Sequence, residues 1–549
     1  MPTVSEHVAV TLARHVAHVF GVMGNGNAYF LDALERKTGA SYTAVRHEVG
    51  GVVAADAFQR AGGGLAAATA TYGPGFTNTL TALVEAHRAS SPLVLVVGDE
   101  PRSGRRAWDV DQVALASATG VRTYSVGRTD AAATTLSAIE HALISRRPVV
   151  LAIPYDLAQQ EAGPVVEVPM AQSPAPVALS SASAEALREL AQVLASAKRP
   201  FLLAGRGAWL SGAGKALAAL ADATGAVTGT SALGRGLFAS AKYDVGVTGG
   251  FGADGAMELI READVAVVFG ASLNQWTTRF GELFAPGTQV TQIDVAPVAT
   301  HPVVNRYIKG DAAIAAEALL AELEALGSTS SGWRETVDVE ALRVQDAGEA
   351  LAPDGRLDPR SVAARIGELL PDDRVVVSDG GHFLGWANMY WPVAAPDRMV
   401  MVGTAFMSIG LGFPSVPGAA MAKPTSTVVL TTGDGGGLMA LADLESAVRV
   451  AGGRGLACVW NDAAYGAEVN LYGVKGLADA PMRIPEVDFA ALARAVGAEG
   501  VVVRELADLE HLATWTARPA EERPFLLLDL RVSVDVIAPY QQEVLRLNS

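Results

Sequence analysis

The chain contains 549 residues, of which 50% are hydrophobic and 18% are charged, and its net charge is −16. This length is enough for about three or four domains, and the composition excludes a generally disordered chain. Because the balance is acidic and no long basic run occurs, we expect neither nucleic acid nor an anionic membrane as a partner. The single cysteine, Cys458, excludes a disulfide framework and a cysteine metal cluster.

The N-terminal segment Met1–His7 lacks the basic start and the apolar core of a signal peptide. No stretch of about 20 uninterrupted apolar residues occurs anywhere in the sequence, so no membrane-spanning helix is predicted. We therefore expect a soluble, cytoplasmic protein.

Short apolar runs alternate with Ala-rich helical stretches along the whole chain. Continuous apolar strands between helices are typical of parallel sheets that are covered on both faces. The predicted strands include, in chain order, residues 65–71, 93–97, 149–153, 201–203, 265–269, 290–293, 375–377, 428–431 and 456–460. The pattern predicts an α/β protein built from doubly wound parallel sheets.

Two breaks divide this pattern. Residues 159–183 contain four prolines and many small polar residues, and residues 327–359 are rich in Gly, Ser, Pro and Asp. Such stretches suit surface connections between domains. We predict three α/β domains, comprising residues 1–165, 184–330 and 356–549.

In the first domain, the segment Tyr42–Phe58 begins like a strand and ends like a helix of small residues. Glu48 stands at the junction, close to Gly50 and Gly51. A buried carboxylate is costly unless it is paired or protonated. On this segment alone, the favoured interpretation is a helix N-terminal charge stabilised by the helix dipole, and a functional carboxylate is the alternative.

The strongest local signal lies in the third domain, where the apolar strand at 428–431 runs into a glycine-rich turn at 433–437 and then into a helix. Glycines let the backbone approach a ligand closely, and the start of a helix favours anions. Asp434 lies inside this turn. A carboxylate beside a bound phosphate would repel it unless a cation intervened, which indicates Mg²⁺.

The next strand, at 456–460, leads into Asn461, which stands 27 positions after Asp434. One strand–helix–strand unit would bring both residues to the carboxyl edge of the sheet, where open α/β sheets bind ligands. Together with a nearby backbone carbonyl, they could form a magnesium diphosphate site. The alternative is a tight glycine turn followed by an ordinary Asn-Asp turn, but the strand context and the spacing favour the site.

Gly433-Asp434-Gly435, followed after 25 residues by Asn461-Asp462, resembles the thiamine-diphosphate motif. Asp462 replaces the usual second Asn of that motif, and its effect on the charge of the metal site is left open. Further matching segments are Phe20–Gly24, Arg46–Glu48, Gly73–Asn78 and Met407–Pro414. Over nearly its whole length, the chain resembles the thiamine-diphosphate-dependent superfamily of acetolactate synthases, benzoylformate decarboxylases and benzaldehyde lyases.

This resemblance implies a pyrimidine-binding first domain, a central domain and a diphosphate-binding third domain. It implies that Glu48 hydrogen-bonds N1′ of the aminopyrimidine ring and so activates the cofactor, whose C2 ylid attacks a carbonyl. It also implies a homodimer or homotetramer with active sites at the subunit interface, because Glu48 of one subunit would meet the diphosphate site of another.

The resemblance further implies a set of site residues. Asp434, Asn461 and the Ala463 carbonyl match the metal ligands. Contacts to the cofactor are implied for Gly73, Asn78, Gly381, His382, Met407, Ile409, Gly433, Asp434, Gly435, Gly436, Asn461, Tyr465 and Gly466. Simple core packing is the alternative for Ile409, and a surface-loop position is the alternative for His382.

A substrate pocket is expected around Asn25, Thr71, Gln112 and Val469, although packing explains Asn25 and Gln112 equally well. In the central domain, Gly205 and Gly207 offer a Gly-x-Gly turn without the third glycine of a dinucleotide fingerprint. FAD, which acetolactate synthases bind around this domain, is therefore considered but not favoured.

The predicted function is that of a thiamine-diphosphate-dependent lyase or transferase that acts on a 2-keto acid or aldehyde. The favoured reaction decarboxylates a 2-keto acid to an enamine and forms an acyloin, as acetolactate synthases do. A simple 2-keto acid decarboxylase or a 2-hydroxyacyl lyase is the neighbouring alternative. A non-catalytic, cofactor-binding regulatory protein and a nicotinamide oxidoreductase are the alternatives from other classes.

Overall fold

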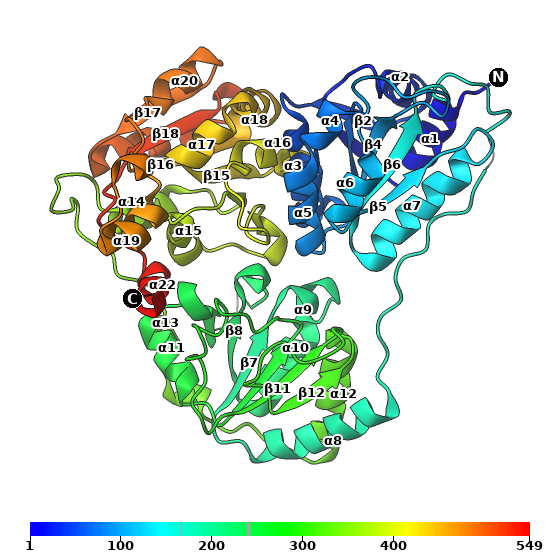
Figure 1. The fold of residues 1–549 in the computed structure, drawn as a ribbon. Coiled ribbons are helices and arrows are strands. Elements are labelled where there is room, and N and C mark those ends of the chain that lie inside the picture. Colours follow the sequence, from blue (N-terminus) through cyan, green and yellow to red (C-terminus); the bar gives the residue numbers. More distant parts are fainter. Residues whose placement is uncertain (166, 239–241, 549) are drawn as a thin grey trace.

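The computed structural model describes residues 1–165, 167–238 and 242–548. These residues form three α/β bodies, each built on a six-stranded sheet in which every strand pair is parallel (Figure 1). The α/β prediction is confirmed. Among the described residues, no helix combines the length and apolar character that crossing a membrane requires.

The N-terminal sheet has the strand order β2-β1-β3-β4-β6-β5. Its strands are β1 (His18–Gly21), β2 (Ser41–Ala44), β3 (Ala66–Ala70), β4 (Leu93–Asp99), β5 (Arg122–Ser125) and β6 (Pro148–Pro154). The helices that accompany it are α1 (Val4–Ala13), α2 (Ala28–Lys37), α3 (Glu48–Phe58), α4 (Pro74–Thr77), α5 (Leu80–Arg88), α6 (Gln112–Ala118) and α7 (Ala131–Ser145).

The central sheet has the order β12-β11-β10-β7-β8-β9. Its strands are β7 (Pro200–Ala204), β8 (Val227–Thr230), β9 (Asp244–Val247), β10 (Val265–Phe269), β11 (Gln289–Asp294) and β12 (Arg306–Lys309). Its helices are α8 (Ser181–Ser196), α9 (Arg206–Leu210), α10 (Gly214–Thr224), α11 (Asp254–Arg261), α12 (Ala312–Ala325) and α13 (Val339–Leu342).

The C-terminal sheet has the order β14-β13-β15-β16-β18-β17, which repeats the topology of the N-terminal sheet. Its strands are β13 (Arg374–Ser378), β14 (Met399–Met401), β15 (Thr427–Gly433), β16 (Gly455–Asn461), β17 (Glu499–Val503) and β18 (Leu526–Arg531). Its helices are α14 (Pro359–Leu369), α15 (Leu384–Tyr390), α16 (Gly412–Ala422), α17 (Asp434–Met439), α18 (Leu444–Ala451), α19 (Gly466–Tyr472), α20 (Phe489–Ala495), α21 (Glu510–Thr516) and α22 (Pro539–Asn548).

The predicted domain limits can be compared with these elements. Position 184 falls inside α8, and the side chains of Trp333 and Val339, beyond position 330, pack into the core of the central domain. The limits 1–165, 184–330 and 356–549 therefore remain predictions.

In the central domain, a Cβ on Gly205 would lie 2.4 Å from the Gly270 carbonyl oxygen, so the close approach of two turns accounts for this glycine.

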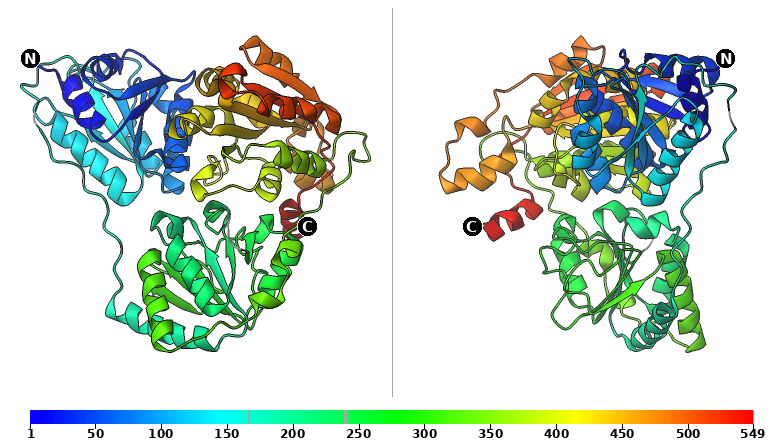
Figure 2. Two further views of the ribbon diagram at one scale, coloured as in Figure 1. Left: turned by 180° about the vertical axis from the view of Figure 1, so that it is seen from behind. Right: turned by 45° about the vertical axis from the view of Figure 1, so that its right-hand side comes forward.

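Helices α3 and α16 hold the N-terminal and C-terminal domains together (Figure 1 and Figure 2). One continuous buried cluster contains Val52 and Ala55 from the first domain and Phe413 and Val416 from the third. The two helices are so close that a Cβ on Gly418 would lie 1.9 Å from the Ala54 carbonyl oxygen. This contact fixes the position of Glu48, the first residue of α3, relative to the C-terminal domain.

We expect Gly418→Ala to destabilise the protein by about 1–3 kcal/mol, because the added methyl group must push two packed helices apart. Thermal unfolding measures the effect. The matched control is Gly214→Ala in α10, where the nearest atoms to the new methyl group lie 3.8 Å away and no loss is expected. Equal melting temperatures of Gly418→Ala and wild type would contradict the close-contact interpretation.

Candidate functional site

The carboxyl edge of the C-terminal sheet carries the glycine-rich turn. Strand β15 ends at Gly433, which pairs with Trp460 on β16, so Asp434 and Asn461 come next on two adjacent strands. Both side chains are buried, at 3% and 0% exposure. The sequence-based expectation that the two residues meet at this edge therefore matches the geometry.

The side chain of Asn461 has a fixed orientation. Its Nδ2 donates to Asp529 Oδ1 at 2.8 Å and to the Val487 carbonyl at 3.0 Å. This leaves Oδ1 buried and without a hydrogen-bond partner among the described residues. Asp434 Oδ2 is also buried and without a partner, while its Oδ1 accepts from Gly435 N at 2.9 Å.

Two buried oxygens without partners cost stability unless a cation or a donor satisfies them. Burial, and then repulsion from the nearby Asp462, raise the pKa of Asp434 to about 7. No group of three His, Cys, Asp or Glu side chains suited to a metal occurs in the described part of the chain. A hard cation here would therefore take one carboxylate, one amide and backbone oxygens, a donor set that suits Mg²⁺.

The backbone at Ala463 adopts a left-handed conformation, with φ of 58°. Its carbonyl accepts a hydrogen bond from Ile484 N at 2.9 Å, which leaves the second lone pair for a further contact. The predicted third ligand is thus next to Asn461 but already tied to the segment around Ile484.

Asp462, the departure from the usual motif, has a partner. His382 Nε2 lies 2.9 Å from Asp462 Oδ2, and Ala464 N donates to Asp462 Oδ1 at 3.1 Å. Burial lowers the pKa of His382, but the Asp462 carboxylate outweighs this effect and the net pKa is raised. The extra carboxylate is therefore matched by His382, which is partly buried and faces the site.

The predicted glycines lie where the backbone must pass close to other groups. A Cβ on Gly435 would lie 2.7 Å from the Tyr465 ring, and a Cβ on Gly466 would lie 2.4 Å from the His382 ring. Gly381 has φ of 144°, and its carbonyl and that of His382 accept from Tyr540 Oη at 3.3 and 2.6 Å. The C-terminal helix α22, which carries Tyr540, thus holds the Gly381–His382 turn in place.

Asp379, which the sequence analysis did not single out, organises the same edge. This carboxylate is 0% exposed and accepts from the backbone N–H groups of Gly380, Gly410 and Leu411 at 2.8–3.2 Å and from Thr432 Oγ1 at 2.9 Å. A Cβ on Gly436 would lie 2.7 Å from its Oδ2. Burial raises its pKa. Its place at the end of β13, directly before two glycines, is the signal that could have identified it.

Met407 and Ile409 lie on the loop between β14 and α16. Met407 has φ of 61° and is 74% exposed, while Ile409 is half-buried. Ser408 N donates to the Gly403 carbonyl at 2.9 Å, which closes the loop on itself. The loop therefore presents the Met407 side chain outwards.

A buried ionic cluster of the first domain holds this loop. Arg60 donates to Asp56 at 2.6 and 2.8 Å, to Glu85 at 2.9 Å and to the Met401 carbonyl at 2.6 Å. Glu85 in turn accepts from Phe406 N at 2.7 Å. The three charged side chains are at most 9% exposed, so the loop is anchored on both sides by buried charge. The sequence analysis missed this cluster.

Glu48 begins α3 and has a side chain that is 17% exposed. Asn78 Nδ2 donates to Glu48 Oε2 at 3.0 Å. A Cβ on Gly75 would lie 3.3 Å from Oε1, so the Gly73–Asn78 segment packs directly against the carboxylate. The structure thus brings Glu48, Asn78 and the Gly73 turn together.

The predicted substrate residues Asn25, Thr71 and Gln112 gather at the carboxyl edge of the N-terminal sheet. Gln112 is 3% exposed, accepts from Gly73 N at 2.8 Å and donates to the Gly98 carbonyl at 2.9 Å. Thr71 Oγ1 accepts from Gly26 N, and Asn25 Nδ2 donates to Tyr72 Oη, both at 2.9 Å. These bonds position the Gly73 turn, and a direct substrate contact remains a prediction.

Val469 stands apart from these three residues. It lies half-buried on α19, three residues after Gly466, with which this helix begins. Its role in a substrate pocket also remains a prediction.

Three family models of thiamine pyrophosphate enzymes match the chain in order. The N-terminal TPP binding domain matches residues 2–118, the central domain matches residues 187–319, and the C-terminal TPP binding domain matches residues 379–528. The chain therefore belongs to the thiamine pyrophosphate enzyme family. It is an enzyme of the class that makes or breaks C–C bonds with thiamine diphosphate as cofactor.

Within this family, the chain is similar to acetolactate synthases. It is 28% identical to the acetolactate synthase isozyme 3 large subunit of Escherichia coli (strain K12), over 79% of this chain and 78% of the relative. It is 27% identical to the probable acetolactate synthase large subunit of Methanococcus aeolicus, over 78% of this chain and 75% of the relative. It is also 26% identical to the sulfoacetaldehyde acetyltransferase of Roseovarius nubinhibens, over 99% of this chain and 94% of the relative.

On the prediction that Asn461 binds Mg²⁺, we expect Asp529→Asn to weaken Mg²⁺-dependent binding of thiamine diphosphate by about 10–100-fold, the usual cost of losing a partner of a metal ligand. The new amide would donate to Asn461 and turn its Oδ1 away from the predicted cation position. Quenching of tryptophan fluorescence at increasing Mg²⁺ measures the effect. Asp488→Asn, an exposed neighbour, is the control. Unchanged Mg²⁺ dependence in a folded Asp529→Asn variant would contradict this role.

Proposed function

We propose that this enzyme is a thiamine-diphosphate-dependent carboligase that decarboxylates a 2-keto acid and joins the product to a second carbonyl compound, as an acetolactate synthase does. The observation that carries the proposal is the pair of buried, unpartnered oxygens on Asp434 and Asn461, at the sheet edge where the glycine turns meet. The likeness to acetolactate synthases from two organisms supports the choice of reaction.

The residues present fit Mg²⁺ and the diphosphate group. Asp434, Asn461 and the Ala463 carbonyl would hold the metal. The diphosphate would lie along the backbone of Gly433, Gly435 and Gly436 and beside the Gly381–His382 turn. The fixed amide of Asn461 means that an oxygen, and not a nitrogen, is offered to the cation.

When bound, thiamine diphosphate supplies a nucleophilic carbon and an electron sink. Glu48 would hold a proton at N1′ of the aminopyrimidine ring. Asn78 fixes Glu48 Oε2, so Oε1 is the oxygen that can make this hydrogen bond. Met407 and Ile409 would hold the ring from the other side, on the loop that the Arg60–Glu85 cluster anchors.

The site is proposed to be complete only in a homodimer or homotetramer. Met407 is 74% exposed in the single chain, which is unusual for a large apolar side chain proposed to contact a cofactor. Coverage by the Glu48-bearing domain of a second subunit would bury it.

A second candidate function is action on a sulfonated aldehyde. The Roseovarius relative, a sulfoacetaldehyde acetyltransferase, matches over 99% of this chain, more than the share matched by the acetolactate synthases. Simple decarboxylation and 2-hydroxyacyl cleavage remain neighbouring alternatives within the same class.

The role of Glu48 is tested by hydrogen–deuterium exchange at C2 of bound thiamine diphosphate. We expect Glu48→Gln to slow exchange by about 100-fold or more, because an amide cannot hold the proton at N1′ in the same way. Glu35→Gln, an exposed carboxylate on α2, is the control and should exchange at the wild-type rate. Equal exchange in Glu48→Gln and wild type would remove Glu48 as the activating residue.

The reaction is tested by NMR analysis of products from the Mg²⁺-loaded enzyme. With pyruvate alone, we expect an acetohydroxy acid in excess over free acetaldehyde. Acetaldehyde as the main product would indicate a simple decarboxylase. Turnover of sulfoacetaldehyde without turnover of pyruvate would favour the second candidate.

A further inference from the structure

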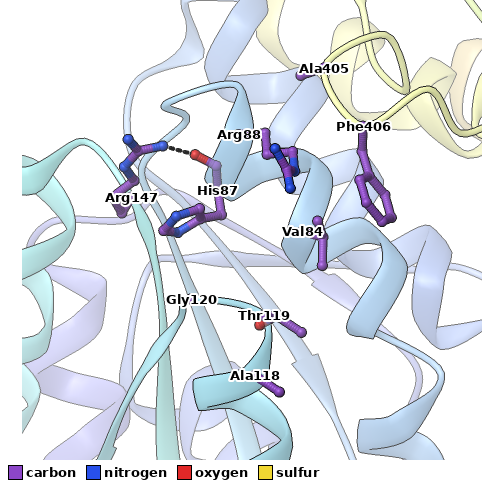
Figure 3. A pocket seen from close by; sticks show the side chains of 9 residues that line it. All are labelled: Val84, His87, Arg88, Ala118, Thr119, Gly120, Arg147, Ala405 and Phe406. Carbon is purple, nitrogen blue, oxygen red and sulfur yellow. Dashed lines mark hydrogen bonds between the residues drawn. The ribbon is translucent and has the colours of Figure 1, made fainter.

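A hollow lies at the edge of the N-terminal sheet opposite the carboxyl edge that carries Glu48. It has a volume of about 650 Å³ and is lined by Val84, His87, Arg88, Ala118, Thr119, Gly120, Arg147, Ala405 and Phe406 (Figure 3). Its walls come from the ends of α5 and α6 and from the residues directly before β6. These residues lie at the amino ends of β4, β5 and β6. Glu48, which follows β2, lies at the opposite, carboxyl edge of the same sheet.

The hollow concentrates positive charge in a chain whose net charge is −16. Arg88 and Arg147 line it, and Arg146 is adjacent in the sequence. Within the described ranges, none of these three arginines has a carboxylate within ion-pair distance. Uncompensated arginines beside one hollow attract an anion.

The nearest acidic residue on α5 does not neutralise this charge. Glu85 lies one helical turn before Arg88, but its carboxylate is fully buried and is occupied by Arg60 and by Phe406 N. Burial, and then the charges of Arg147 and Arg88, lower the pKa of His87. The positive charges of both arginines therefore act on the His87 ring.

The arginines are held in different ways. Arg147 Nη1 donates to the His87 carbonyl, which fixes its guanidinium at the rim (Figure 3). Arg88 is exposed and lies over the Phe406 ring, with its guanidinium carbon 5.7 Å from the ring centroid. One cation is thus fixed in place and the other can adjust to a ligand.

Apart from His87 and Thr119, the rest of the lining is apolar or glycine backbone. Phe406 and Val84 lie beside Arg88, and Ala118 and Ala405 complete the apolar part of the lining (Figure 3). The volume lies in the range of small-molecule sites. Arginine pairs match the oxygens of a phosphate group, and an apolar wall matches an organic substituent.

We propose that this hollow binds a small organic phosphate, held by Arg88 and Arg147 and packed against Phe406. Its wall includes Ala405 and Phe406, which directly precede Met407. On the proposed function, in which Met407 holds the cofactor, a ligand here would rest on the loop that shapes the active site. By linkage, cofactor and phosphate ligand would then change each other's affinity by the same factor.

Isothermal titration calorimetry with phenyl phosphate tests the site, using protein saturated with thiamine diphosphate and Mg²⁺ so that the diphosphate site is filled. We expect one molecule bound per chain, and at least 10-fold weaker binding in Arg88→Glu and in Arg147→Gln. Arg122→Glu makes the same charge change as Arg88→Glu at an exposed arginine of this domain that stacks on Tyr124, and it should bind as wild type does.

Circular dichroism confirms that each variant is folded, and because calorimetry measures binding and not turnover, the result does not depend on which reaction the enzyme catalyses. The proposed site would be ruled out if phenyl phosphate did not bind to wild type, or if it bound equally well to wild type and to Arg88→Glu. If inorganic phosphate bound more tightly than phenyl phosphate, the proposal of an organic phosphate would be wrong and the ligand would be free phosphate.

Discussion

The contact between α3 and α16 is the constraint on which the rest of the molecule depends. Backbone meets backbone at Gly418 and Ala54, with no room for a side chain between them. Because the first and third domains share one apolar cluster across this contact, their two sheets keep a fixed relation. Glu48 at the start of α3 and the loop before α16 are therefore positioned by packing rather than by the cofactor.

Buried charge refines this arrangement. Asp379, Asp529 and the Arg60–Glu85 pair each connect segments that lie far apart in the sequence, and each does so with charge-assisted hydrogen bonds. Such groups are costly to bury unless every partner is in place. Asp434 and Asn461 differ from these groups, because each keeps one buried oxygen without a hydrogen-bond partner among the described residues, and this supports the proposed metal site.

All nine strands predicted from apolar runs are present, and Asp434 and Asn461 do meet at one sheet edge, because strand order and spacing determine both outcomes. The edge strand β5 escaped prediction because its residues are exposed or half-exposed and mostly polar. The hydrogen-bond partners of Asn461 and of the Met407 loop also escaped prediction from the sequence. Asp529 lies 68 positions from Asn461, and Glu85 lies 321 positions from Phe406, so no local pattern could reveal them.

The shared cluster also has a consequence for how the chain is made. The ribosome releases the first domain before the third exists, so the face of α3 around Gly50 and Ala54, which meets Asp443 and Gly418 of the third domain, has no partner until those residues emerge. The central domain, inserted between them, lengthens that interval. A nascent chain of this protein therefore carries an exposed apolar helix during much of its synthesis, and this is the period in which it is most prone to aggregate or to need a chaperone.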